Sequence, residues 1–452
     1  MPCAPRWAVA IHELAAMHYS TLKAACSASP KSFKLAFLNP EGADRPLFSP
    51  VPAAVLDRAR AYRQARLRAE LARSDCAAAL LYDPVNIRYA LDAPSMQVWT
   101  MHNSARYALV LADGPAILFE YAGAEHLSAA IPVVDEVRRA VRWLNMAVGR
   151  HQPELLGVWA ADIDSLLREH GGGNRRLAID KLDLPAVRAL ERLGVELVDA
   201  QPLAEAARAI KSAEEVELMA WSIRVCEAGL ARMWLASQPG RTEQEIWAEL
   251  QHENTRSGGD WLEARLLTAG PRTNPWLAEC SDYVCQEGEI IALDTDMVGP
   301  YGYCADLSRS WTCGHVPFTP TQRALYAVAL EQIEHNVALL RPGLGFLEFI
   351  EQSWRIPERY QERRYGLALH GVGLCDEWPV LPDHPDTTYA YDGVFEENMT
   401  VCVESLIGAE GTECIKLETQ VLITAEGPVR LAMFRAAVDG VESGYGRQRG
   451  GR

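Results

Sequence analysis

The stretch from Glu289 to Trp311, EIIALDTDMVGPYGYCADLSRSW, limits what this chain can fold into more than any other part of the sequence. Its first half is typical of a strand, because residues 290–293 form a short β-favouring apolar run that leads to a Gly-Pro turn. Side chains two positions apart on a strand share a face, so Asp294 and Asp296 are expected to point the same way. A second strand after the turn is expected to return Asp306 toward them, as in a hairpin.

Aspartates that meet in a largely apolar sheet need compensation for their charge. Such carboxylates repel one another and lose solvation, which is tolerable only with a cation between them or with protons on them. A single aspartate is more often a turn cap or a solvated surface group. Three of them within the thirteen residues from Asp294 to Asp306 favour the cation.

Further side chains that bind metals occur downstream. His370 precedes a glycine-rich turn, LHGVGLCDEWP, whose glycines allow close approach of the backbone. Glu404 interrupts the apolar run VCVES. Glu418 interrupts CIKLETQVLIT, on the strand face that also carries Lys416 and Gln420. Carboxylate oxygens with one imidazole suit a divalent or trivalent transition metal, and bridging glutamates would allow a pair of ions.

The length of 452 residues predicts two domains. In the first fifty residues, prolines interrupt any helix. Strand and helix patterns then alternate, which is typical of an α/β domain. Ser212 and Glu215 have the spacing of a capping box, which predicts the start of a long helix there. The last residues are rich in Gly and Arg. The expected organisation is an irregular arm over 1–50, an α/β domain over 51–210, a second domain over 211–438 and a flexible tail over 439–452.

Local patterns predict individual elements of both domains. Helices are expected over residues 55–74, over LPAVRALERLG, over RTEQEIWAELQHENTRSG with Thr242 as its cap, and over PTQRALYAVALEQIEHNVALL. Strands are expected in CAAALLYDP, IRYALDA, YALVLA, PAILFEYA and LAIDK.

Composition excludes several classes of protein. The net charge of −16 argues against nucleic acid or an anionic membrane as partner, since both require basic patches. The sequence contains no run of eighteen apolar residues, so no membrane span is expected. The amino terminus does not resemble a secretory signal. The eleven cysteines are scattered and odd in number, which favours reduced thiols in a cytoplasmic protein.

The motifs as a set resemble a known superfamily. The order Asp, Asp, His, Glu, Glu, with HGVG at the histidine and the last two glutamates fourteen residues apart, is similar to the creatinase, prolidase and methionine-aminopeptidase superfamily of pita-bread proteins. Longer strings, among them LLYDPVNIRYALDAPSMQVWTMHN, GGGNRRLAIDK and LHGVGLCDEWP, resemble the DddP-type dimethylsulfoniopropionate lyases. This resemblance covers roughly residues 75–424 and leaves out the first fifty.

The resemblance implies the fold, the metal and the assembly. The fold class would be α/β (α+β), with an amino-terminal creatinase-like α/β domain and a carboxy-terminal pita-bread metal-binding domain, in a homodimer. The metal would be iron, one or two ions per subunit, although the ligand types alone equally allow manganese, cobalt or zinc. The ligands carried over are Asp294, Asp296, Asp306, His370, Glu404 and Glu418.

The lyase branch implies β-elimination of dimethylsulfoniopropionate, a small zwitterionic sulfonium compound, to dimethyl sulfide and acrylate. A metal ion would bind the substrate carboxylate and acidify the adjacent C–H, and Asp376 would remove the proton. Aromatic faces would hold the sulfonium group, an attraction worth on the order of 1 to 2 kcal/mol when buried. The expected substrate contacts are Trp99, Tyr365, Trp378 and Asp180, with Trp276 as a further aromatic candidate. The alternative without a functional role is that each tryptophan packs in the core and that Asp376 lies in a solvated loop.

Two other functions stay open. One is a prolidase-like Xaa-Pro metallopeptidase, and the other is a non-catalytic binding protein that kept the pita-bread fold. The peptidase branch carries two helper histidines, one in the loop before the first metal strand and one seven residues after the metal histidine. Here that loop reads GPRTNPWLAE and the later position is Glu377, which tells against peptidase activity. Carboxylates kept without a metal would only destabilise a sheet, which tells against the binding protein.

Overall fold

The structure is a computed structural model that describes residues 51–384 and 387–432. The chain divides into two compact units: an N-terminal unit, residues 51–214, and a C-terminal unit, whose described part begins at Glu215. The arm predicted over 1–50 and the tail predicted over 439–452 lie outside the described residues.

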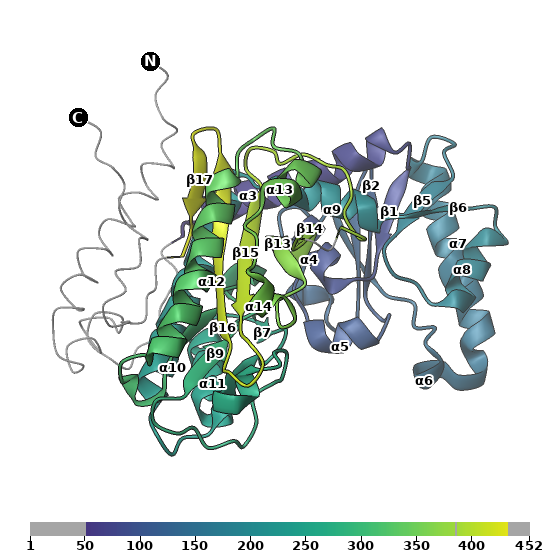
Figure 1. The fold of residues 1–452 in the computed structure, drawn as a ribbon. Helices are drawn as coiled ribbons and strands as arrows, with labels where there is room; N and C mark the ends of the chain where they lie inside the picture. The colour runs from purple at the N-terminus through teal and green to yellow at the C-terminus, as the bar shows by residue number, and fades with distance from the viewer. Residues whose placement is uncertain (1–50, 385–386, 433–452) are drawn as a thin grey trace. The chain divides into compact units, whose positions relative to one another are not determined.

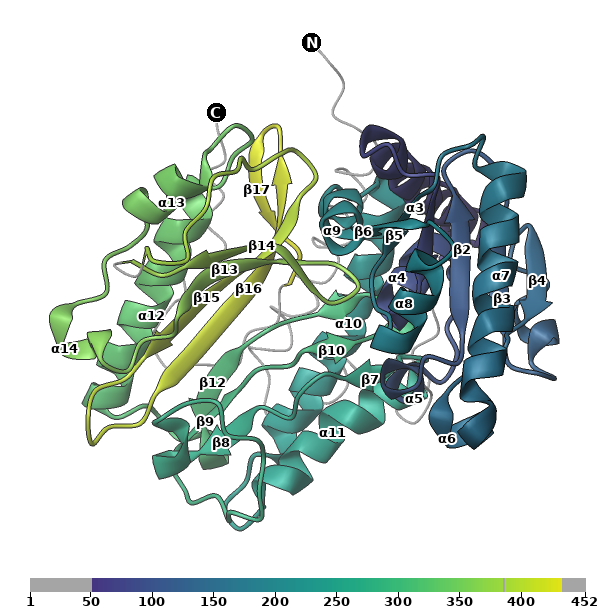
Figure 2. The ribbon, with the colours of Figure 1, turned by 90° about the vertical axis from the view of Figure 1, so that its right-hand side faces the viewer.

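The N-terminal unit is a six-stranded sheet with helices on both faces (Figures 1 and 2). The strand order is β4-β3-β2-β1-β5-β6, and β1 runs antiparallel to β2 but parallel to β5. Helices α7 and α8 cover one face, whereas α3, α4 and α9 lie on the other. The strands are β1 (Ala78–Leu81), β2 (Tyr107–Leu111), β3 (Ala116–Glu120), β4 (Glu136–Arg139), β5 (Arg176–Ile179) and β6 (Glu196–Asp199). The helices are α3 (Ala53–Arg73), α4 (Pro84–Leu91), α5 (Gln97–His102), α6 (Asn145–Val148), α7 (Gln152–His170), α8 (Leu184–Glu191) and α9 (Gln201–Ala209).

The core of this unit lies between the sheet and helix α7. Trp159, Ile163 and Leu167 recur at four-residue spacing, so they share one face of α7 and are buried against β1 and β2. The predicted strands in CAAALLYDP, YALVLA, PAILFEYA and LAIDK are confirmed, as are the helices α3 and α8.

The strand predicted in IRYALDA is wrong, because this segment belongs to helix α4. The helix has clear start signals: the Asp83 side chain accepts a hydrogen bond from Val85 N, and Pro84 occupies the first turn. Asp92 ends it in a left-handed conformation. These caps outweigh the apolar pattern that favoured a strand.

The described part of the C-terminal unit contains three sheets, of which the largest carries the strand order β14-β13-β15-β16-β17 (Figure 2). Helix α12 packs on β15 and β16. The smaller sheets are β12-β9-β8 and β11-β10-β7. The strands are β7 (Trp261–Leu262), β8 (Leu267–Ala269), β9 (Ile290–Leu293), β10 (Met297–Val298), β11 (Cys304–Ala305), β12 (Arg309–Thr312), β13 (Leu367–Val372), β14 (Asp376–Pro382), β15 (Thr400–Ile407), β16 (Ile415–Thr424) and β17 (Gly427–Arg430). The helices are α10 (Ala213–Ala236), α11 (Glu243–Arg256), α12 (Pro320–Leu339), α13 (Phe346–Gln352) and α14 (Glu358–Gln361).

The predicted helices of this unit are confirmed together with a predicted cap. Thr242 and Glu245 form a reciprocal capping box at the start of α11. Thr319 and Gln322 form a second box at the start of α12. Each box satisfies backbone N–H groups that a helix end leaves without a partner.

The hairpin predicted over residues 289–311 forms in two pieces. Strand β9 pairs with β12 and β10 pairs with β11, but the two pairs belong to different sheets. Asp296 lies at the break with a φ of 36°, in the left-handed region. The expectation that Asp294 and Asp296 lie on one continuous strand is therefore wrong: both lie where the chain crosses from one sheet to the next.

Within the ranges that the structure describes, no helix is long and apolar enough to cross a membrane.

A buried carboxyl group of the C-terminal unit should make the stability of the protein depend on pH. Asp383, directly after β14, is 1% exposed, and burial raises its pKa to about 7. The folded protein therefore keeps a proton that the unfolded chain releases near pH 4, so stability falls as pH rises from about 4 to 7, by at most about 4 kcal/mol. We expect Asp383→Asn to raise the thermal midpoint at pH 8 and to leave it nearly unchanged at pH 4.5. An equal shift at both pH values would contradict this.

Candidate metal centre

The predicted ligands come from separate segments of the C-terminal unit, three beside short strands and three on the large sheet, and they converge. Asp294 and Asp296 follow β9, and Asp306 lies between β11 and β12. The remaining ligands lie on the large sheet: His370 on β13, Glu404 on β15 and Glu418 on β16.

Sheet register explains why the last ligands meet. Glu404 and Glu418 are directly opposite on the antiparallel strands β15 and β16. His370 is opposite Cys402, which is two residues before Glu404 and so shares its face. Directly opposed side chains on paired strands start about 5 Å apart, which brings these ligands together.

The glycines after the histidine allow two close approaches. A side chain on Gly371 would meet the carbonyl oxygen of Trp378 at 2.3 Å, and one on Gly373 would meet the Glu377 carboxylate at 2.4 Å. The prediction that the HGVG glycines permit close backbone approach is confirmed.

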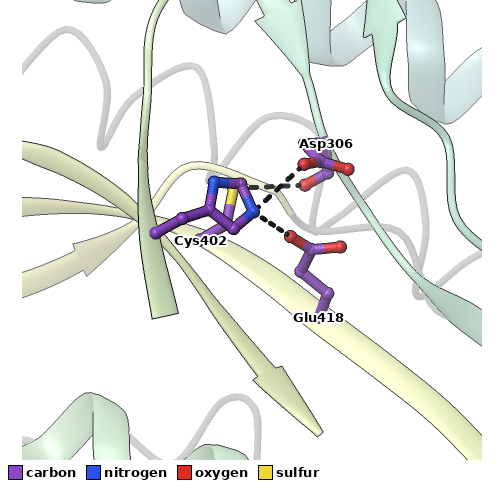
Figure 3. A group of neighbouring side chains, drawn as sticks. Asp306, Cys402 and Glu418 are labelled. Atoms are coloured by element: carbon purple, nitrogen blue, oxygen red, sulfur yellow. Dashed lines mark hydrogen bonds and ion pairs between the residues drawn. The ribbon is translucent and has the colours of Figure 1, made fainter. Parts of the chain in front are cut away.

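His370 presents one ring nitrogen to three carboxylates. Its Nδ1 lies 2.9 Å from the carbonyl oxygen of Gly371, which can only accept, so Nδ1 carries the proton. Nε2 lies 3.4 Å from Asp306 Oδ2, and Figure 3 shows Asp306 and Glu418 facing the same space with Cys402 beside them. The other distances from Nε2 are 3.3 Å to Glu404 Oε1 and 3.4 Å to Glu418 Oε1.

Burial perturbs the ionisation of these carboxyl groups. It raises the pKa of Asp296 to about 9, that of Asp294 to about 6 and that of Glu404 to about 7. Burial and the neighbouring Glu418 raise the pKa of Asp306 well above its usual range. Although burial opposes ionisation of Glu418, nearby cationic groups hold its pKa below the usual range. The protein's own charges thus leave the cluster short of positive charge.

Two buried side chains of this cluster were not anticipated from the sequence. Lys416 lies among the carboxylates, with Nζ 2.6 Å from Glu404 Oε2 and 3.0 Å from Asp294 Oδ2. Ser308 donates to Glu418 Oε2 at 2.8 Å. A signal existed for both: Lys416 shares a strand face with Glu418, and Ser308 follows Asp306 by two positions.

The donor atoms fit a metal ion. Two buried oxygens, Asp294 Oδ1 and Glu418 Oε1, accept no hydrogen bond from the part of the chain that the structure describes. An oxygen-rich set with one imidazole suits a divalent transition metal. The ligand atoms form three groups, within each of which they lie within 4.8 Å of one another: Asp306, His370, Cys402 and Glu418; Asp294, Asp296 and Asp306; and Asp294, Glu404 and Glu418.

Asp376 lies at the solvent side of the cluster. It is the first residue of β14, its side chain is 59% exposed, and its Oδ1 lies 3.5 Å from His370 Nδ1. Partial desolvation of the carboxyl group, with Glu418 and Glu377 nearby, raises its pKa, whereas His370 lowers it. Asp376 belongs to none of the donor groups found among the described residues.

The residues predicted to contact substrate are divided between the units. In the C-terminal unit, one ring face of Tyr365 carries the Lys416 ammonium at 4.8 Å, and Trp378 packs edge-on against Phe346 at 5.1 Å. Trp276 is buried. All three rings therefore have contacts within the protein, and their predicted contact with substrate stays a prediction.

In the N-terminal unit, Trp99 is 41% exposed and packs edge-on against Tyr121 at 5.5 Å. Asp180 accepts hydrogen bonds from Tyr82 N, Asp83 N and the Asn86 side chain. Asp180 thus fastens the end of β1 to the end of β5, and its predicted role at the substrate site stays a prediction.

The second helper position of the peptidases is filled by a structural carboxylate. Glu377 is buried, and its Oε1 accepts a hydrogen bond from Leu374 N at 3.1 Å. A carboxylate committed to the turn after His370 cannot take the part of a histidine that donates a proton.

Comparison with known proteins agrees with this architecture. Residues 217–425 match the metallopeptidase family M24, and residues 63–210 match the creatinase/prolidase N-terminal domain. An Xaa-Pro dipeptidase from Bacillus anthracis superposes with a TM-score of 0.66 at 19% identity, over 84% of this chain and 99% of that one. A prolidase from Pyrococcus horikoshii OT3 gives 0.66 at 16% identity, over 83% and 99%. The fold and the site together define a protein of the creatinase/prolidase class of metalloenzymes, which confirms the predicted fold class.

More similar relatives identify the family. A dimethylsulfoniopropionate lyase DddP from Roseovarius nubinhibens is 40% identical over 389 residues, which cover 84% of this chain and 86% of the relative. One from Roseobacter denitrificans is 41% identical over 395 residues, which cover 85% and 88%. The chain belongs to the DddP family of dimethylsulfoniopropionate lyases, and it is therefore an enzyme of the carbon–sulfur lyase class. The resemblance drawn from the motifs is confirmed.

Proposed function

We propose that this protein eliminates dimethyl sulfide from dimethylsulfoniopropionate and leaves acrylate, at a transition-metal centre that holds iron. The observation that carries the proposal is the position of Asp376, an exposed carboxylate next to the histidine of a buried donor cluster. The relatives that share about 40% of its residues bear the name of this lyase.

The residues that would hold the metal are Asp294, Asp296, Asp306, His370, Glu404 and Glu418. When bound, the ion would supply Lewis acidity to the substrate carboxylate, which acidifies the neighbouring C–H. Asp376 would take that proton on a carboxylate oxygen. The C–H electron pair becomes the C=C bond of acrylate, and the C–S pair departs on sulfur, so the sulfonium leaves as neutral dimethyl sulfide.

His370 contributes to the base as well as to the metal. Its Nδ1 lies 3.5 Å from Asp376 Oδ1 and 2.9 Å from the carbonyl oxygen of Gly371. A proton held there favours the ionised form of Asp376, which is the form that can accept a proton. For the sulfonium group, the proposed aromatic partner in this unit is the ring of Tyr365.

Headspace detection of dimethyl sulfide is the test of this reaction. Purified, metal-analysed protein is given dimethylsulfoniopropionate, and an Xaa-Pro dipeptide assay runs in parallel. We expect dimethyl sulfide and acrylate in equal amounts and no dipeptide cleavage, because Glu377 replaces a helper histidine. Cleavage without dimethyl sulfide would establish the peptidase alternative. If metal-loaded protein forms neither product, dimethylsulfoniopropionate is not the substrate.

A further inference from the structure

One of the three donor groups, that of Asp294, Glu404 and Glu418, already surrounds a cation that belongs to the protein. Lys416 Nζ lies 3.0 Å from Asp294 Oδ2, 2.6 Å from Glu404 Oε2 and 3.7 Å from Glu418 Oε2. The side chain of Lys416 is fully buried. An ammonium in contact with these oxygens fills the space that a metal ion bound to all three carboxylates would need.

Neighbouring groups hold this ammonium in place. Lys416 Nζ donates to Ser308 Oγ at 2.7 Å, and the ring of Tyr365 lies 4.8 Å from Nζ on another side. The backbone is fixed as well, because Lys416 N donates to Ser310 Oγ at 3.0 Å and that hydroxyl donates to Lys416 O at 2.9 Å. Asp294, Glu404 and Ser308 give the three ammonium protons their acceptors.

The contacts divide the oxygens of each carboxylate between two sides. Glu404 turns Oε2 to Lys416 and Oε1 to His370 Nε2, at 3.3 Å. Glu418 turns Oε2 to Ser308 and Oε1 to His370 Nε2, at 3.4 Å. Asp294 turns Oδ2 to Lys416, and its Oδ1 is buried and accepts no hydrogen bond from the described residues. Each carboxylate thus keeps one oxygen for a ligand on the side away from Lys416.

We propose that Lys416 is a built-in cation of the centre. Together with Ser308 it engages one oxygen of each of the three carboxylates and excludes a metal ion from the space enclosed by Asp294, Glu404 and Glu418. It thereby leaves metal binding to the side of the cluster that holds Asp306 and His370, where Glu404 Oε1 stays available as a ligand. Lys416 is a positioning residue in this role, since it acts through the ligands and not on the substrate. The inference concerns metal placement alone and holds for a lyase and a peptidase alike.

Diffraction from the wild-type protein crystallised with Mn²⁺ and measured at the manganese absorption edge tests the placement directly. We expect anomalous density beside Asp306 and none within bonding distance of both Asp294 and Glu404. Density bonded to those two carboxylates together, with the Lys416 side chain displaced, would overturn the proposal.

Metal stoichiometry tests the exclusion independently. Lys416→Met keeps the length of the side chain and removes its charge, which leaves three carboxylates uncompensated, so we expect about one additional equivalent of Mn²⁺ at saturation. Lys416→Arg should keep the wild-type count. Lys211→Met removes the ammonium of a buried lysine outside the centre, which donates to Ala209 O at 3.5 Å, and should also keep it. An unchanged count in folded Lys416→Met would refute the exclusion, and the wild-type diffraction decides the question if that variant does not fold.

Discussion

Asp376→Ala is expected to abolish release of dimethyl sulfide while the protein keeps its full metal content. A positioned general base contributes roughly 10²- to 10⁴-fold to a rate, so kcat should fall by about 10³-fold. The metal should stay, because Asp376 is 59% exposed and belongs to none of the donor groups of the described residues. The measurements are headspace dimethyl sulfide and metal analysis of the same preparation.

Control variants distinguish a role of Asp376 as the base from a structural or metal-binding role. Asp376→Asn keeps the shape of the side chain and removes its basicity, and it should be as inactive as the alanine variant. Asp392→Ala removes an exposed aspartate of the same unit and should keep wild-type activity. Full activity in Asp376→Ala would disprove the assignment, and loss of metal together with activity would make Asp376 a ligand.

Asp306→Asn is expected to lose both metal and activity, because Asp306 belongs to two of the three donor groups. Loss of a residue that only supports a ligand typically lowers metal affinity by about 10- to 100-fold. Loss of a ligand itself should cost at least as much, so we expect metal affinity to fall by about 100-fold or more. Equilibrium dialysis against a chelator measures the affinity. Dimethyl sulfide release should fall below detection in the same samples.

Stability distinguishes this loss from misfolding. Burial and the Glu418 carboxylate raise the pKa of Asp306, so its charge is unfavourable in the metal-free protein. The neutral asparagine removes that cost, and the metal-free variant should melt no lower than the metal-free wild type. Asp383→Asn, at a buried aspartate of the same unit outside the donor groups, should keep both metal and activity. A metal-replete, active Asp306→Asn would show that the centre lies elsewhere.

The sequence alone predicted the candidate ligands that lie on long strands. Glu404 interrupts a continuous apolar run and Glu418 lies in an alternating one, and strand periodicity fixes which face of a strand a side chain occupies. Local capping signals also sufficed, since Thr242 begins α11 as its spacing predicted. These features depend on residues a few positions apart, so they can be derived without knowing what packs against them.

Local signals failed where two of them competed. IRYALDA has an apolar pattern that fits a strand, yet Asp83 and Pro84 start a helix there. Around Asp296 the pattern favoured one continuous strand, yet the chain leaves β9 to join a different sheet at β10. Strand periodicity gives the face of a residue but not the sheet to which the strand is paired, because pairing depends on distant segments.

What the sequence by itself determined about this protein is its fold class and its family, and it also predicted the candidate donor residues. Only the tertiary structure decided how those donors share charge. Lys416 and Glu418 share a strand face in the sequence, but the contacts of Lys416 with Asp294 and Ser308 cross more than 100 positions of chain. The division of the Glu404 and Glu418 oxygens between the Lys416–Ser308 side and the His370 side arises from sheets brought together in space, which no local pattern encodes.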